Sequence, residues 1–345
     1  MATIGNTALT FADWAKRVDG TGKMTGIIEL LSLNNEMINE ALVLEGNLPT
    51  GHRTTIRTGI PQGTWRLLNS GIPTTKSTTA QITHDCGNLE NETAIDVDLA
   101  ALNGNTAAFR LSESSAVIQG MSQQMQTALI YGNSTLNPEQ FTGFTPYYNS
   151  LTAQTGQNII DAGGTGTDNT SIWIVVWGPE TVHCFTPKGA PTGLQHMDKG
   201  EQRVFDAAGG SYYAYVDRYK WQLGLAVRDW QYCVRIANID VSDLATVNAA
   251  NLINLLVRAL RKMPTTPTNT SPIQTSDAPT GRTGPMGRTV IYCNRTISTY
   301  LDLQAMNKTN VYLTATEWGG RPVTTFRGIP IRNVDAILNT ESRVV

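Results

Sequence analysis

The sequence predicts an α+β protein in which one long helix and several antiparallel strands accompany a basic hairpin. Three stretches lead to this prediction. Residues 108–133 have the strongest helical periodicity in the first half of the chain. Residues 211–240 alternate aromatic and β-branched residues with polar ones, as half-buried strands do. Residues 46–84 contain no Asp or Glu and are rich in Thr, Gly and Pro, so they need a partner to pack against.

The composition is that of a folded protein with an unremarkable overall charge. The chain has 345 residues, of which 40% are hydrophobic, and this is ample for a packed core of one or two domains. A net charge of -2 argues against a general binder of nucleic acid or membrane surfaces, although residues 46–84 form a local basic patch. We expect no membrane anchor and no secretory signal, and therefore a cytoplasmic product. The four cysteines are far apart in sequence, which predicts buried reduced thiols.

The first half of the chain is expected to contain helices and the hairpin. Short helices are predicted at 11–18 and 25–44, and an acidic one at 91–102. The hairpin would have arms at 52–60 and 64–72, separated by Pro-Gln-Gly. In the long helix, one apolar face and a Gly132 stop are expected. That face would carry Leu111, Ile118, Met121, Met125, Ala128 and Leu129.

The second half reads as a mixed α/β region. Ser171–Trp177 is a continuous apolar run, typical of a strand buried on both faces. Residues 211–240 would form two or three antiparallel strands, and a helix within 241–263 would have Ser242 as its N-cap. The Pro/Thr/Gly-rich stretch 264–287 is expected to be a surface insertion. The end of the chain is expected to form a strand at 288–294, a helix at 295–306 and strands around 311–315 and 326–338.

The motifs give no support to enzymatic chemistry. The Gly-rich run Ala162–Thr170 precedes a strand, whereas a dinucleotide fingerprint follows one. No nucleophile motif occurs, and no cofactor or metal is predicted. Arg228 and Asp229 could be a catalytic pair, but we interpret them as an interstrand ion pair at a packed interface. The histidines are dispersed along the chain, at His52, His84, His183 and His196.

Several phrases resemble a known family. They are GNLPTGHRTTIRTGIPQGTWRLLNSGIPTTKS, LNGNTAAFRLSE, NIIDAGGTGTDNTSIWIVVWG and KWQLGLAVRDWQYCVRIANIDVS. The segments follow one another as an arm, a basic hairpin, a long helix and a mixed α/β region. These phrases and this order resemble the major capsid proteins of tailed bacteriophages, in particular short-tailed ones, with the Hong Kong 97-like fold.

The resemblance implies a domain plan and a set of partners. The chain would be a structural subunit of an icosahedral capsid, forming hexamers and pentamers around packaged double-stranded DNA. A decoration or cement protein, a scaffold and a portal would be further partners, with no membrane involved. The alternative is a nucleic-acid-binding protein that uses the basic hairpin as an arm. The implied parts are an N-terminal arm (1–45), an extended hairpin or E-loop (46–84), a peripheral domain with the spine helix (85–145), a mainly axial domain (146–290, with its insertion at 264–287) and a returning C-terminal segment (291–345).

The hairpin is expected to lie on a neighbouring copy of the chain, whose carboxylates would supply the acids that it lacks. One member of the wider family seals its shell with a Lys–Asn bond between subunits. Lys76 is the only lysine of the hairpin, but no motif accompanies it, so we expect non-covalent assembly. The predicted intersubunit residues are Arg53, Arg57, Trp65, Arg66, Lys76, Asp96, Asp98, Glu113, Arg228 and Asp229.

Overall fold

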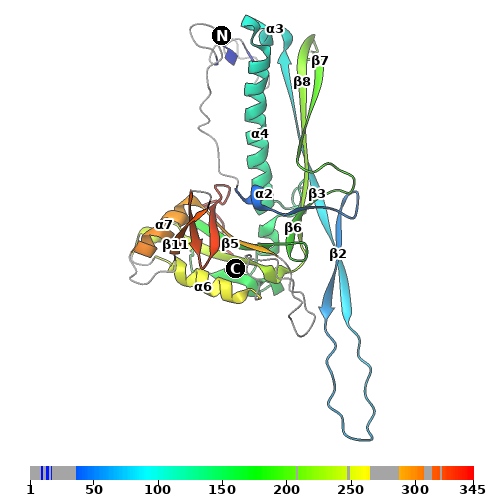
Figure 1. The fold of residues 1–345 in the computed structure, drawn as a ribbon, viewed down its shortest axis with the longest axis vertical. Helices are drawn as coiled ribbons and strands as arrows, with labels where there is room; N and C mark the ends of the chain where they lie inside the picture. The colour runs from blue at the N-terminus through cyan, green and yellow to red at the C-terminus, as the bar shows by residue number, and fades with distance from the viewer. Residues whose placement is uncertain are drawn as a thin grey trace.

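The computed structural model shows an elongated molecule with three parts (Figure 1). A mixed α/β body lies at the centre, a rod of one helix and long strands rises from it, and a thin hairpin projects from the opposite end. The residues that the structure describes are 9–10, 13–14, 17, 36–206, 209–246, 249–264, 287–306, 313–318 and 321–345. Most of the predicted helix at 11–18, residues 25–35 of the next one and nearly all of the 264–287 insertion lie outside them.

The described helices differ greatly in length. The long predicted helix is confirmed as α4, and the predicted helix at 295–306 is confirmed as α7. The α-helices are α2 Glu36–Glu40, α3 Val97–Ala100, α4 Thr106–Tyr131, α5 Phe144–Tyr147, α6 Leu252–Lys262 and α7 Arg295–Met306. Short 3-10 turns are η1 Leu102–Gly104, η2 Gln154–Asn158, η3 Trp230–Tyr232 and η4 Asp243–Ala245.

The described strands form one connected network in the order β11-β12-β13-β10-β5-β6-β8-β3-β2, with β1, β4, β7 and β9 attached at its sides. The strands are β1 Val43–Glu45, β2 Gly51–Gly59, β3 Thr78–Asp96, β4 Ile159–Asp161, β5 Asn169–Trp177, β6 Val182–Thr186, β7 Leu194–Phe205, β8 Ser211–Val227, β9 Cys233–Asp240, β10 Arg288–Cys293, β11 Leu313–Trp318, β12 Arg321–Phe326 and β13 Ile329–Asn333.

The body is built around β5, every residue of which is buried, as predicted for a strand covered on both faces. Helices α6 and α7 contribute to the apolar core on one face. The C-terminal end of α4 and the residues around α5 contribute to the core on the other, where Phe144 and Tyr148 contact the Trp173 ring. A small third core closes the far end of the rod, where Phe109 of α4 meets Leu99 of α3.

Strand β3 connects the hairpin to the rod. Its first part pairs antiparallel with β2, from Thr78 opposite Gly59 to Asp85 opposite Gly51. Its second part pairs antiparallel with β8, up to Asp96 opposite Ala214. A single strand of 19 residues therefore runs from the hairpin to the top of the rod, and the direction of the hairpin follows from the direction of the sheet.

Two predictions about the first half are wrong. Of the acidic helix predicted at 91–102, only Val97–Ala100 is helical, as α3. Residues 91–96 belong to β3, because they pair continuously with β8, and Glu92 lies there opposite Arg218. The second arm of the hairpin is residues 78–85 rather than 64–72. Residues 60–77 have no regular structure beyond one turn, since prolines at 61 and 73 lack the N–H that a ladder needs.

Two further predictions fail in detail. Ser242 does not begin the helix before Pro264; its hydroxyl donates to Asp240, and α6 begins ten residues later with Asn251 as its N-cap. In α4, the predicted buried face is buried only toward the C-terminus. Leu111 is 70% exposed and Ile118 is 43% exposed, because that half of the helix stands away from the body (Figure 1).

Candidate subunit interface

The hairpin reverses direction at a short turn at its tip. The Ser70 amide donates to the Leu67 carbonyl at 3.2 Å, and the Arg66 guanidinium donates to the Ser70 carbonyl at 3.0 Å. Asn69 adopts a positive φ of 67°, which Asn tolerates better than most residues. The turn therefore presents its side chains to the surroundings at the far end of the molecule (Figure 1).

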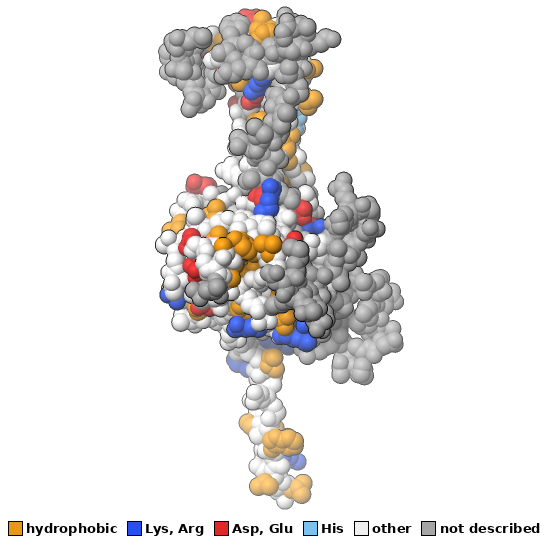
Figure 2. Space-filling model, turned by 90° about the vertical axis from the view of Figure 1, so that its left-hand side faces the viewer, with side chains coloured by type: hydrophobic (Ala, Val, Ile, Leu, Met, Phe, Trp, Pro, Cys, Tyr) orange, Lys and Arg blue, Asp and Glu red, His pale blue; other side chains and the backbone are white. Residues whose placement is uncertain are grey.

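Large apolar side chains gather at this tip, which we define as residues 60–77. Figure 2 shows them as separate orange groups at the end of the thin arm. Trp65 is fully exposed and Leu68 is 89% exposed. Burial of one such side chain contributes about 1.5–3 kcal/mol, so a set of them facing water marks a contact surface. The set is Ile60, Trp65, Leu67, Leu68 and Ile72.

The basic residues of the hairpin have no acidic partner within the described part of the chain. Arg53 donates from Nε to the Thr83 hydroxyl at 3.3 Å, and Arg66 is held by the turn. Arg57 and Lys76 are exposed. The charges of all four residues are therefore available to form ion pairs with carboxylates of another molecule.

The carboxylates predicted as their partners lie at the other end of the molecule (Figure 1). Asp96 caps α3 by accepting from the Asp98 amide at 2.8 Å, and Asp98 itself is exposed. Glu113 forms an ion pair with Arg17 at 2.6 Å. The fold does not bring these three acids to the basic hairpin of the same chain, so any pairing between the two groups has to join separate copies.

Arg228 and Asp229 are held in the connection after β8 and do not face each other as an ion pair. The Arg228 guanidinium donates to the Pro179 carbonyl at 2.9 Å. The Asp229 carboxylate accepts from the Gln231 amide at 2.9 Å and caps η3. Both side chains therefore shape local backbone near the base of the hairpin.

A charged cluster that the sequence did not reveal fastens α4 to the β7–β8 hairpin. Arg110 contacts Asp198 and Asp217, each at 2.9 Å. His196 contacts the same Asp217 oxygen at 2.9 Å and stacks on Tyr219. Hydrogen bonds to the Gly200 amide and to Arg110 hold the pKa of Asp198 below its usual range. The cluster therefore joins α4 to β7 and β8 through charged contacts.

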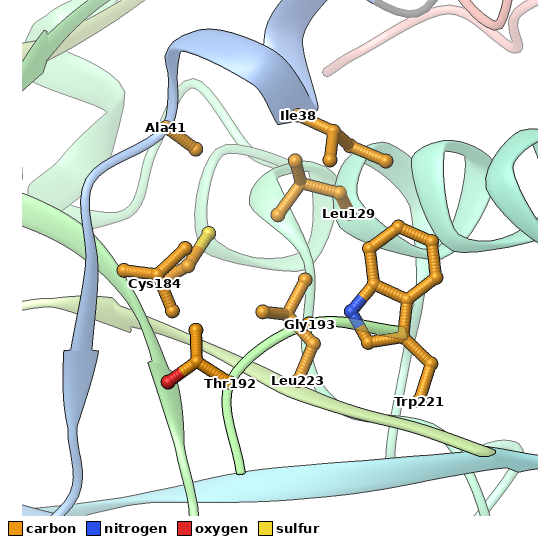
Figure 3. A pocket seen from close by; sticks show the side chains of 9 residues that line it. Ile38, Ala41, Leu129, Cys184, Thr192, Gly193, Trp221 and Leu223 are labelled. Atoms are coloured by element: carbon orange, nitrogen blue, oxygen red, sulfur yellow. The ribbon is translucent and has the colours of Figure 1, made fainter. Parts of the chain in front are cut away.

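An apolar pocket of about 190 Å³ lies where α2, α4, β6 and β8 meet (Figure 3). Its one thiol, Cys184, is buried, and burial raises the pKa of that thiol to about 12. A thiol that stays protonated at neutral pH is a poor nucleophile, and the lining offers no carboxylate or imidazole for acid–base chemistry. The pocket is lined by Ile38, Ala41, Val43, Leu129, Cys184, Thr192, Gly193, Trp221 and Leu223.

The rest of the described residues also give no indication of a reaction centre. They include no group of three His, Cys, Asp or Glu side chains placed to hold a metal ion. No helix in the described ranges is long and apolar enough to cross a bilayer. A chain with a projecting arm, cations without acidic partners and an apolar tip has the features of one subunit of a larger protein assembly.

Comparison with known proteins identifies that assembly. Residues 19–345 match the family described as major capsid protein GP7, and the chain belongs to this family. It is similar to a chain in the near-atomic-resolution structure of bacteriophage Epsilon15, at 35% identity and a TM-score of 0.76, over 100% of this chain and 99% of that one. A comparison with curated proteins gives no significant match.

A second solved structure shares the fold at low identity. The bacteriophage JBD30 capsid matches with a TM-score of 0.50 and 8% identity, over 89% of this chain and 93% of that one. The resemblance to tailed-phage major capsid proteins with the Hong Kong 97-like fold is thereby confirmed. The protein is a structural subunit of an icosahedral phage capsid, and its place is the virion.

Proposed function

We propose that the hairpin, residues 46–84, is the arm by which each subunit grips its neighbour as the chain assembles into hexamers and pentamers. An arm that reaches from one copy onto a different surface of the next makes a heterologous contact, and such contacts close into rings when the rotation between copies permits. Rings of six and five then build the shell, which encloses double-stranded DNA.

The main support for this proposal is the exposure of apolar side chains at the tip. Five large apolar side chains on an arm without a core of its own are exposed in the single chain. The four cations between and beside them favour a protein partner with acids around an apolar centre. The predicted domain plan is consistent with this role, with 46–84 as E-loop, α4 as the spine helix of a peripheral domain (85–145) and 146–290 as the mainly axial domain.

The remaining partners follow from the same proposal. A scaffold, a portal and a decoration or cement protein would bind the assembled shell, and the DNA would face its inner wall. The role is structural and without catalysis, and the chain would be made in the cytoplasm of the bacterial host.

The proposal is tested by removing apolar surface from the tip. The variant W65S/L67S/L68S should keep the circular dichroism and urea midpoint of the monomer, because these side chains support no core. It should fail to form particles in sucrose-gradient sedimentation and electron microscopy. Leu136→Ser is the matched control, since Leu136 is also exposed but lies in the loop after α4, and it should assemble normally.

Normal particles from the triple variant would refute the role of the tip. The competing function, a nucleic-acid-binding arm, makes a different prediction. A dispersed monomer that shifts DNA with an affinity falling steeply as salt rises would favour it. The exposed apolar side chains argue against it, because phosphate contacts need cations rather than aliphatic groups.

A further inference from the structure

Three of the four histidines meet at the base of the hairpin, where β2 and β3 leave the body beside β6 (Figure 1). His52 of β2 and His84 of β3 are direct cross-strand partners. His183 of β6 contacts His52, with ring centroids 5.4 Å apart and the rings nearly perpendicular. The sequence did not reveal this cluster, because His52 and His183 are 131 positions apart.

Two histidines of the cluster are buried, His52 is half-buried, and several of their ring nitrogens lack a hydrogen-bond partner. His84 is 3% exposed and His183 is 1% exposed. The Nδ1 atom of His84 lies 3.1 Å from the Tyr147 hydroxyl, but its Nε2 atom is buried without a partner. The Nδ1 atom of His52 is also buried without one. A protonated imidazole has an N–H donor on both ring nitrogens, and burying its charge without partners is costly. The unpartnered nitrogens here therefore favour neutral rings over charged ones.

The surrounding charges also disfavour proton uptake. Burial, and then the neighbouring His52, lowers the pKa of His84 to about 4, although Asp85 on β3 acts in the opposite direction. Burial, followed by His52 and by Arg228 after β8, lowers the pKa of His183 to about 4. Burial and Arg228 lower the pKa of His52 as well. Tyr147 of α5 stays a neutral phenol, because burial raises its pKa to about 12.

We propose that His52, His84 and His183 form an acid-sensitive hinge at the base of the hairpin. At neutral pH the rings pack as neutral groups and fix the direction in which the arm leaves β6. On acidification the rings take up protons, repel one another and Arg228, and draw in water. The base of the arm then separates from β6. The hinge is a property of the single chain; its consequence, a change in how one subunit grips the next, rests on the proposed function of the arm.

The sign of the effect follows from linkage. A histidine that titrates at about 6.5 when exposed and at about 4 when packed takes up a proton more readily in the open state. Acid therefore favours opening, with an effect that grows below about pH 6.5 and levels off below about pH 4. At about pH 5 the opening equilibrium shifts by about 30-fold for each such histidine that becomes exposed.

Hydrogen–deuterium exchange on the unassembled full chain tests the hinge without requiring an assembled shell. Exchange at neutral pH and at about pH 5, corrected for intrinsic rates, should show that opening increases by at least about 20-fold in peptides around His52, His84 and His183. Peptides from β5 should remain protected. The double variant H84N/H183N should lose most of this pH dependence, whereas His196→Asn, which changes the histidine outside the cluster, should behave as the wild type.

Unchanged protection of the three strands in the wild type would overturn the proposal, as would an equal acid response in H84N/H183N. If the double variant does not fold, nuclear magnetic resonance of histidine-labelled wild-type chain decides the question. Ring signals of His84 and His183 that titrate well below 6.5 together with exchange at the hairpin base support the hinge; titration near 6.5 contradicts it. If the tip variants assembled normally, the proposed role of the arm would be refuted, but the proposal of an acid-sensitive hinge would not be affected.

Discussion

The Arg235 guanidinium and the Glu341 carboxylate lie 2.8 Å apart inside the body, and both side chains are almost wholly buried. Arg235 also donates to the Tyr148 carbonyl at 2.7 Å, and Glu341 accepts from the Tyr131 hydroxyl at 2.5 Å and from the Ser171 hydroxyl. The network therefore joins β9, β5, the last residue of α4 and the C-terminal tail.

Removal of one member of this pair should destabilise the chain strongly. Glu341→Ala leaves the Arg235 charge buried without its partner, which typically costs about 3–5 kcal/mol. Urea unfolding of the monomer measures the loss. The matched control is Glu90→Ala, because Glu90 pairs with Arg218 on an exposed part of the sheet, and such pairs contribute about 0–1 kcal/mol. Equal losses in the two variants would contradict the role assigned to the buried network.

Replacement by alanine should have opposite effects on stability at two glycines, one in α4 and one packed against its end. A Cβ at Gly143 would lie 2.5 Å from the Ala128 carbonyl oxygen and 2.6 Å from that of Leu129, and backbone there cannot move aside easily. Gly143→Ala should cost about 1–3 kcal/mol or more. Gly120 lies within α4 with open space around it, so Gly120→Ala should gain about 0.4–1 kcal/mol. Thermal unfolding of both variants measures the two changes in stability. If Gly143→Ala stabilised the chain, the expected clash with the Ala128 and Leu129 carbonyl oxygens would be refuted.

Charge reversal in the hairpin should separate assembly from folding. The variant R53E/R57E/R66E should keep the circular dichroism of the monomer, since no ion pair within the described chain depends on these residues. It should not form particles, because a neighbour's acids would then repel the arm. The control R53K/R57K/R66K keeps the charges and should assemble. Particles of normal size and yield from the reversed variant would exclude an electrostatic role for the arm.

Lys76 is exposed and lies in the irregular tip, without a motif for a covalent seal. Mature particles boiled in denaturant under reducing conditions should therefore run as a single monomer band on a gel. Lys76→Arg, which keeps the charge and removes the amine, should leave the heat stability of particles unchanged. A ladder of oligomers that disappears in Lys76→Arg would mean that the shell is sealed covalently.

Local patterns in the sequence were sufficient for many of the elements. Helix α4 and strand β5 were predicted because each has a long, consistent pattern of apolar residues that favours one structure. The acid-free hairpin was evident because composition alone shows that the stretch cannot form a core. The family resemblance added an expected domain plan to these local predictions, and the match over residues 19–345 confirms the family.

Long-range contacts decided the rest. Residues 91–96 have acids that suit a helix start, yet pairing with β8 makes them a strand, because eleven consecutive backbone partners outweigh a weak local preference. Leu111 and Ile118 follow the helical period, but only the fold shows that the rod leaves them exposed. The pairing of Arg235 with Glu341 and the meeting of His52 with His183 join residues more than a hundred positions apart. Periodicity describes neighbours along the chain, whereas these contacts depend on which strands lie side by side, and the tertiary structure alone determines that.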